Sequence, residues 1–217
     1  MSFQIFFPSH RRSSEQHTLD NLPANIKKNI TLVVQDSDAW DYEEVAIKHN
    51  LKEMVVLPFS IQSLSPTYEH MIKVLATDDK FFIMDDDLRF AFREFEDLGD
   101  PSLTKCNNQS VIEDMFLALL RRLETHAHVG VSARAGNNHV ACSGEDYTWS
   151  ENSRMMCLTG YKTDVVKQVE TNRVKCRDDF DRHLQLMEMG YANSVLYSFT
   201  HDQASGSNSS GGCSEYR

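Results

Sequence analysis

An apolar run that breaks into three consecutive acids constrains this chain more than any other segment. Residues 81–84 read FFIM, and residues 85–87 read DDD. Successive apolar residues are typical of a buried strand, so we expect a strand over residues 80–84 that delivers carboxylates to one edge of a sheet. Ligand sites in open α/β sheets lie at such strand ends. The segment therefore predicts an α/β fold with a binding site beside residues 85–87, the acidic triplet.

A divalent metal is the natural partner of the acidic triplet, because adjacent carboxylates repel one another unless a cation lies among them. Asp85 and Asp87 form a D-x-D pair. Carboxylates so placed can hold Mn²⁺ or Mg²⁺ and leave coordination positions for substrate phosphates. Asp86 and Arg89, beside this pair, are predicted to contact a bound nucleotide. The alternative is a solvated acidic turn, but the buried strand before the triplet favours the metal site.

Composition limits the class of protein. A chain of 217 residues, 41% hydrophobic and 25% charged, is ordinary for a soluble globular protein and fits one domain over residues 1–202. The Gly- and Ser-rich residues 203–217 are expected to form a flexible loop or tail. The sequence has no apolar stretch near the roughly 20 residues of a membrane span, and its start lacks the features of a secretory signal. Scattered cysteines without a CxxC pair indicate reduced thiols in a cytoplasm.

Short apolar segments alternate with segments of helical composition, which indicates a mostly parallel sheet flanked by helices. Strands are predicted over residues 3–7, 30–34, 54–57, 80–84, 129–132, 155–158 and 194–199. Helices are predicted over residues 22–28, 38–49, 67–76, 109–125, 163–169 and 178–189. Asp38 and Ser65 are expected to cap two of these helices, and Gly190 to end the last. Residues 135–149 are predicted to form a polar loop.

A second acidic cluster, Asp178, Asp179 and Asp181, opens the last predicted helix. Acids at a helix start are favoured by the helix dipole, so capping is one interpretation of all three. The functional interpretation makes Asp179 a general base in a cleft, with Asp178 supporting it or the acceptor. Asp181 is better explained as a capping or orienting group.

The ends of three other predicted strands supply further candidates. His201 follows the last strand, and a neutral imidazole there could complete a metal site, although an isolated histidine is usually not a ligand. The turn at Pro8 and Ser9 offers backbone N–H groups, with Arg11 or Arg12, to an anionic ligand. Asp36, which follows the second strand, could accept a hydrogen bond from a base edge such as a uracil imide. Walker, GxGxxG, GxSxG and HExxH motifs are all missing from the sequence.

With these residues assembled, the chain resembles glycosyltransferases of the GT-A fold, in which a strand leads into D-x-D and a later acidic motif opens a helix. It is similar, more closely, to the TET-associated glycosyltransferases encoded by phages. The matching segments, in chain order, are IFFPSHRR, TLDNLP, TLVVQ, FFIMDDDLRF, GVSARAGNN, GYKTDVV, DDFDRHLQLMEMGYANSVLYSF and GGCS. Two features depart from the family pattern. Asp178 stands where Glu is expected, and the chain ends soon after GGCS, which indicates truncation or the loss of an element that completes the acceptor site.

The resemblance implies transfer of a sugar from a nucleotide donor, a UDP-sugar, to 5-hydroxymethylcytosine in phage DNA, in the host cytoplasm. The positions that match the family's functional residues are Asp85, Asp87 and His201 for the metal, Ser9 and Arg11 for the donor, and Asp179 for the base. In the implied mechanism the metal neutralises the diphosphate leaving group. If the reaction inverts the anomeric configuration, Asp179 removes the hydroxymethyl proton. A retaining reaction would remove that role, and the sequence leaves both open.

The net charge of −10 is the main objection to a DNA acceptor, because proteins that grip nucleic acid broadly are basic. A local patch remains open, as does the alternative that its arginines are solvated helix-face charges. The candidates for such a patch are Arg89, Arg93, Arg121, Arg122 and Arg134. Two other functions stay open as well: a GT-A enzyme acting on a glycan, protein or small molecule, and a nucleotide-sugar-binding module without turnover.

Overall fold

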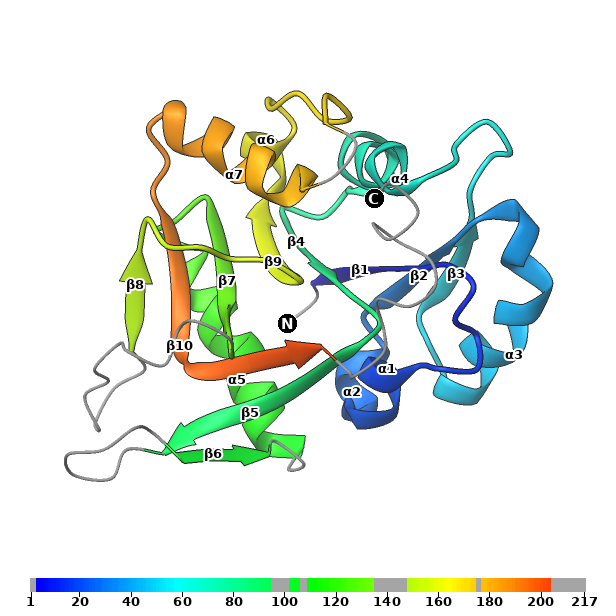
Figure 1. Ribbon diagram of the computed structural model, residues 1–217, viewed down its shortest axis with the longest axis horizontal. Helices are drawn as coiled ribbons and strands as arrows, with labels where there is room; N and C mark the ends of the chain where they lie inside the picture. The colour runs from blue at the N-terminus through cyan, green and yellow to red at the C-terminus, as the bar shows by residue number, and fades with distance from the viewer. Residues whose placement is uncertain (1–2, 95–101, 106–108, 135–147, 175–176, 204–217) are drawn as a thin grey trace.

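The computed structural model describes residues 3–94, 102–105, 109–134, 148–174 and 177–203 (Figure 1). One sheet runs through the molecule in the order β3-β2-β1-β4-β9-β7-β10-β5-β6, and β8 pairs with β10. The strands are β1 (Gln4–Ser9), β2 (Ile30–Val34), β3 (Glu53–Val56), β4 (Lys80–Met84), β5 (Leu88–Glu94), β6 (Ser102–Lys105), β7 (His128–Ala133), β8 (Trp149–Glu151), β9 (Leu158–Lys162) and β10 (Asn193–Gln203).

The sheet is mostly parallel, as predicted. Strands β1 to β4 are mutually parallel, and β10 runs parallel to β7. Among the described strands, β9, β5 and β8 run opposite to the rest. The carboxyl ends of β1, β2 and β4 therefore meet at one edge of the sheet, where ligand sites of open α/β sheets form.

Helices cover both faces of the sheet (Figure 1). They are α1 (His17–Asn21), α2 (Ala24–Lys27), the 3₁₀ turn η1 (Asp36–Asp38), α3 (Ala39–His49), α4 (Leu64–His70), the π-helical turn η2 (Met71–Leu75), α5 (Gln109–Arg122), α6 (Thr163–Val166) and α7 (Asp178–Glu188). One buried cluster joins one face of the sheet to α1, α2, α3 and α5, and a second joins the other face to α4, η2, α6 and α7. This division follows from the alternation of side chains along each strand.

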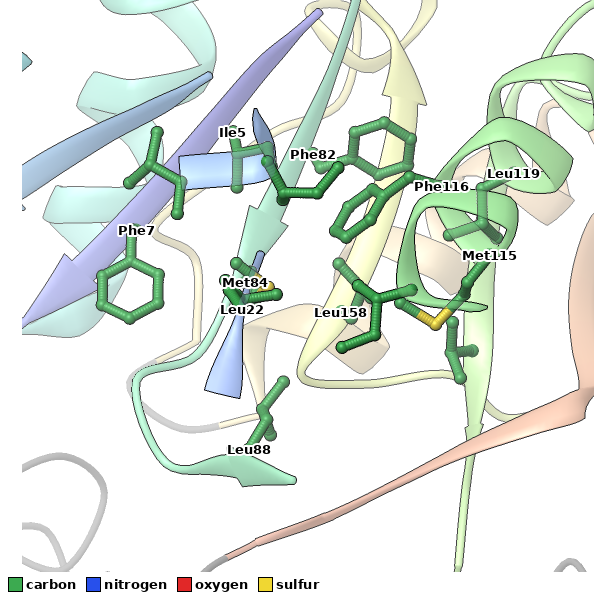
Figure 2. Packing of buried hydrophobic residues seen from close by; sticks show 14 of the residues in the cluster. Ile5, Phe7, Leu22, Phe82, Met84, Leu88, Met115, Phe116, Leu119 and Leu158 are labelled. Atoms are coloured by element: carbon green, nitrogen blue, oxygen red, sulfur yellow. The ribbon is translucent and has the colours of Figure 1, made fainter. Parts of the chain in front are cut away.

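Strand β4 contains the apolar run FFIM at residues 81–84. Phe82 and Met84 belong to the first cluster, whereas Phe81 and Ile83 belong to the second. Figure 2 shows the first cluster, in which the ring of Phe82 meets that of Phe116 on α5 edge to face, with centroids 5.4 Å apart. Because β4 is buried on both faces, its continuous apolar sequence is required, and the chain can turn polar only where the strand ends.

Several local predictions were wrong. Asp38 directly precedes α3, but its carboxylate contacts His10 Nδ1 and accepts from the Arg11 N–H rather than capping the helix. Met155 is not in a strand but is buried against Val195 and Tyr197, and β9 begins only at Leu158. An apolar run can thus be buried without joining the ladder. Ser65 lies inside α4 and donates a hydrogen bond to the carbonyl of Val174 rather than capping the helix. Strands β5, β6 and β8 were not predicted. Most of the predicted loop over 135–149, and the tail beyond residue 203, lie outside the described residues.

Candidate active site

A cavity of about 700 Å³ opens at the carboxyl ends of β1, β2 and β4. Its walls come from these strand ends, from α4, from the segment before β9 and from the first turn of α7. The predicted site residues that line it are Pro8, Ser9, Arg11, Asp36, Asp85, Asp86, Asp87, Asp178 and Asp179. Arg89 is exposed on β5, and His201 is buried in β10; neither lines the cavity. The fold therefore brings both acidic clusters, more than 90 residues apart in sequence, into one site.

Asp86 fixes the position of the acidic triplet. One carboxylate oxygen accepts a hydrogen bond from the Ser9 hydroxyl, which also contacts the Tyr42 hydroxyl at 2.6 Å. The other oxygen accepts from Arg12 Nη1 at 2.8 Å. Burial raises the pKa of Asp86, while Ser9 and Arg12 act against that shift. Both oxygens of Asp86 are thus engaged, one by the last residue of β1 and one by the loop that follows it, which ties the triplet to the first strand.

Asp87 presents a different environment, although it is just as buried. Its Oδ2 atom lies 3.4 Å from both Arg12 Nη1 and Gln203 Nε2. Its Oδ1 atom is buried without a hydrogen-bond partner among the described residues. A buried carboxylate oxygen left unsatisfied is costly, so it suits a bound cation.

Asp85 lies at the junction of three cavity walls. Its Oδ1 atom is 3.4 Å from the Tyr68 hydroxyl on α4. The Cys157 thiol also hydrogen-bonds to the Asp85 carboxylate. Burial raises the pKa of Asp85 well above its usual value, and the neighbouring Asp87 raises it further. No cluster of three His, Cys, Asp or Glu side chains suited to a metal forms within the described ranges. Asp85 and Asp87 could therefore hold a metal only together with other ligands such as phosphate oxygens, a common arrangement for Mg²⁺.

His201 is held inside the sheet. It lies on β10 between Phe90 of β5 and Ala133 of β7, and burial lowers its pKa to about 4. The imidazole is therefore neutral, the form that binds metals. Gln203, two residues further on and so on the same face of β10, is the residue that reaches the cavity and contacts Asp87.

A buried arginine shapes the strand that carries His201 and Gln203. The register between β10 and β7 shifts after Leu196 and resumes at Thr200, which leaves a bulge over residues 197–199. Arg93 Nη1 donates to the carbonyls of Tyr197 and Phe199 and to the Ser132 hydroxyl. Arg93 is 1% exposed, so it is a clamp on this bulge and not part of a surface patch.

In the second acidic cluster, arginines engage two of the three carboxylates. Asp178 pairs with Arg182 Nη1 at 3.3 Å, and Asp181 pairs with Arg173 Nη2 at 2.9 Å. Asp179 forms no ion pair within the part of the chain that the structure describes. Burial raises its pKa, which makes it a stronger base than an ordinary aspartate.

The structure adds residues that sequence reasoning missed. Tyr68 and Cys157 contact Asp85, Gln203 contacts Asp87, and Arg182 stacks over the Tyr68 ring at 5.0 Å while donating to the Tyr161 hydroxyl. Of these, Gln203 had a sequence signal, because it follows His201 with strand spacing. The others depend on contacts between distant segments.

The fold is similar to that of several solved proteins. A mannosyltransferase from Pyrobaculum calidifontis, in complex with GDP-Man and Mn²⁺, matches with a TM-score of 0.57 and 13% identity, over 90% of this chain and 56% of that chain. TarS from S. aureus matches with a TM-score of 0.55 and 14% identity, over 96% and 61%. The chain thus spans less than two thirds of either length. The inositol-1-phosphate CTP transferase from T. maritima matches with a TM-score of 0.56 and 9% identity, over 94% and 91%.

These likenesses confirm the predicted GT-A glycosyltransferase fold. A CTP transferase shares it, so the fold alone does not decide which group is transferred. The sequence decides the class: the family model for the TET-Associated Glycosyltransferase matches residues 3–212. The chain belongs to the TET-associated glycosyltransferases. No curated protein sequence matches it significantly. Within the described residues, no helix has the length and apolar character needed to cross a membrane.

Proposed function

We propose that this chain transfers a sugar from a UDP-sugar to the hydroxyl of 5-hydroxymethylcytosine in phage DNA, in the host cytoplasm, with the help of Mn²⁺ or Mg²⁺. The observation that carries the proposal is the convergence of the two acidic clusters in one cavity. The charges of Asp85 and Asp179 are close enough to raise the pKa of Asp85. A group that binds a diphosphate and a group that accepts a proton therefore face one space.

The end of the cavity away from the acidic clusters suits the nucleoside. Gln35 and Asp36, which follow β2, line it together with Ser37. The Gln35 amide nitrogen donates to the Thr67 hydroxyl at 3.1 Å, which fixes the orientation of the amide. Asp36 is exposed, so its carboxylate can accept a hydrogen bond from a base N–H group such as the uracil imide. Arg11 lies on the same loop as Ser9 and supplies positive charge toward the diphosphate.

Asp85 and Asp87 would hold the metal, and the unsatisfied Oδ1 atom of Asp87 fits that role. His201 would join them as a third ligand if β10 shifts toward the cavity when the donor binds. A bound Mn²⁺ or Mg²⁺ stabilises the negative charge that develops on the leaving diphosphate. Arg12 already offsets part of the triplet's charge, which keeps the carboxylates close together before a metal binds.

Asp179 would act as the base of an inverting reaction. Its raised pKa favours proton transfer from an alcohol, and its lack of an ion pair in the described chain leaves the carboxylate available. Asp178 would support it indirectly, because its pairing with Arg182 places a guanidinium beside Asp179. A base in this position typically contributes about 10²–10⁴-fold to the rate.

The test uses two DNA duplexes of the same sequence, one with hydroxymethylcytosine and one with unmodified cytosine. Each is incubated with the protein, Mn²⁺ and a panel of UDP- and GDP-sugars, and the digested nucleosides are analysed by mass spectrometry. The proposal predicts a sugar-bearing nucleoside from the hydroxymethylated DNA alone, and EDTA should stop its formation.

Other outcomes would favour the other functions. Labelling of both duplexes, or of a glycan alone, would contradict the hydroxymethylcytosine acceptor and favour a different GT-A acceptor. Metal-dependent nucleotide binding without transfer to any acceptor would favour a binding module. Full activity in EDTA would contradict the role of the metal.

A further inference from the structure

Two arginines and an aromatic ring lie close to Asp179, and one of the arginines lines the cavity. Arg177 is exposed, directly precedes α7 and lines the cavity. Phe180 follows Asp179 in the first turn of α7, and the Arg154 guanidinium stacks over its ring at 5.2 Å. Arg154 is exposed and lies two residues before Met156, which also lines the cavity. These three residues are called the mouth cluster below: Arg154, Arg177 and Phe180.

The two arginines of the mouth cluster differ in their ion pairing from three other arginines around the site. Arg12, Arg173 and Arg182 each pair with a carboxylate of one of the acidic clusters. By contrast, neither Arg154 nor Arg177 forms an ion pair with a carboxylate anywhere in the described ranges. Their charge is therefore available to a ligand, whereas that of the others stabilises the site itself.

The chemistry of the mouth cluster fits a nucleic-acid strand better than a neutral glycan. Guanidinium groups bind phosphates, and the planar faces of arginine and phenylalanine stack on bases. An acidic chain with a net charge of −10 must bind DNA through a small footprint, and two exposed arginines with no ion pair among the described residues form such a footprint.

We propose that Arg154, Arg177 and Phe180 form the surface that holds the acceptor strand. The two arginines contact backbone phosphates, and the stacked pair of Arg154 and Phe180 supports a base next to the target. The target hydroxymethyl group is thereby directed toward Asp179, the immediate neighbour of Phe180. This inference rests on the proposed function, because it identifies the residues that bind the acceptor of that reaction.

The experiment measures affinity for a fluorescent hydroxymethylated duplex at a series of salt concentrations. Each phosphate contact contributes about 0.9 to the slope of log affinity against log salt. The double variant Arg154→Ala/Arg177→Ala should therefore reduce that slope by about 2 and weaken binding about tenfold or more at low salt. Phe180→Ala should weaken binding by about tenfold with the slope unchanged, and Phe180→Tyr should restore it, because stacking and not charge is lost.

The matched control is Arg121→Ala, which removes an exposed arginine from α5 on the other face of the sheet. It should leave both affinity and slope as in the unaltered protein. Melting temperature and Mn²⁺-dependent UDP binding are measured for every variant, and neither should change for the double variant. An unchanged slope in the double variant, or an equal loss in Arg121→Ala, would overturn the inference.

Failure of the inference can be told from failure of the proposed function. If the unaltered protein modifies hydroxymethylated DNA but the double variant binds it with the same slope, the mouth cluster is not the acceptor surface and the proposed function stands. If the unaltered protein neither binds nor modifies this DNA, both are wrong.

Discussion

The two acidic clusters have similar compositions but are neutralised in different ways. Each has three aspartates within four residues, and all of them except Asp181 line the same cavity. In the triplet, Arg12 bridges Asp86 and Asp87, and a buried oxygen of Asp87 keeps no partner in the described structure. In the second cluster, Arg182 and Arg173 take the two outer carboxylates separately. What remains there is the single carboxylate of Asp179.

The difference teaches that the number of acids is less informative than what remains after their pairing. Carboxylates crowded together, with an unsatisfied oxygen, favour a cation with several coordination positions. A single partly buried carboxylate with a raised pKa favours a proton. We infer that the triplet binds the metal and the donor diphosphate, whereas the second cluster acts on the acceptor hydroxyl.

The largest expected effect comes from Asp87→Asn. The substitution keeps the size of the side chain but removes the anionic charge from the carboxylate whose Oδ1 atom has no partner in the described part of the chain. Because metal stabilisation of a leaving group is worth several kcal/mol, transfer should fall by about 10²–10⁴-fold. The measurement is transfer rate at saturating donor, with circular dichroism as the control for folding. A folded variant with near-normal, EDTA-insensitive transfer would remove Asp87 from the metal site.

Asp179→Asn should reduce transfer by about 10²–10⁴-fold while increasing stability at neutral pH. Burial raises the pKa of Asp179, so the folded protein holds this proton more tightly than the unfolded chain. Stability is therefore lost as the pH rises from the unfolded pKa through the folded pKa. Asparagine stays neutral, so the variant should melt higher than the unaltered protein at pH 7, and the gap should close below pH 4 or so, near the ordinary pKa. A lower melting temperature at pH 7 would indicate that Asp179 serves as a helix cap instead.

Arg93→Met should have an intermediate effect. Arg93 is buried in the sheet and acts on the acidic triplet indirectly, through the position of Gln203. The substitution removes the Arg93 donor from the carbonyl of Tyr197, at a cost of about 1–3 kcal/mol, and leaves the carbonyl of Phe199 to the Ser132 hydroxyl. The bulge should then relax and move Gln203 away from Asp87, so metal-dependent UDP binding should weaken about tenfold, with partial rescue by Arg93→Lys.

Gly160→Ala is the matched control for the loss of stability in Arg93→Met. A β-carbon at Gly160 would lie 2.5 Å from the Phe82 ring, so the variant should lose about 1–3 kcal/mol by overpacking. Its UDP binding per folded molecule should stay normal. Equal weakening of UDP binding in both variants would mean that Arg93 acts through stability alone.

The smallest effect is expected from Asp181→Asn, which tests whether Asp181 and Asp179 have different roles within the second acidic cluster. Asp181 lies two residues from Asp179 but binds Arg173 and Gln185 near the surface. Its loss should cost about 1 kcal/mol or less and leave transfer within about twofold. Transfer rates and melting temperatures of Asp181→Asn and Asp179→Asn, measured side by side, check this. A large loss of transfer in Asp181→Asn would show that the cluster does not divide as we infer.

The short apolar strands in the first half of the chain could be predicted because their sequence signals are local. Strands β2 and β4 have the predicted bounds, since each is a short apolar run between polar residues. Strand β5 was missed, because its sequence LRFAFRE includes Arg93, which is buried with hydrogen bonds to the Ser132 hydroxyl on β7 and to two carbonyls of β10. A charged residue in a buried strand has no sequence signal when its partners lie on strands far away in the sequence.

The candidate site could likewise be predicted only in part. Its carboxylates could be predicted because strand ends and helix starts are visible in the sequence. Their pairing could not, because Arg12 with Asp86, Tyr68 with Asp85 and Arg182 with Tyr161 join segments that meet only in the folded chain.

The most direct test of the division of roles is calorimetric titration of UDP in the presence of Mn²⁺ into Asp87→Asn and Asp179→Asn, each also assayed for transfer to hydroxymethylated DNA. Both variants should lose transfer. Only Asp87→Asn should lose Mn²⁺-dependent UDP affinity, because an interaction needed mainly in the transition state does not alter donor binding. The account would be contradicted if Asp87→Asn bound UDP with unchanged Mn²⁺ dependence, or if Asp179→Asn lost donor affinity together with transfer.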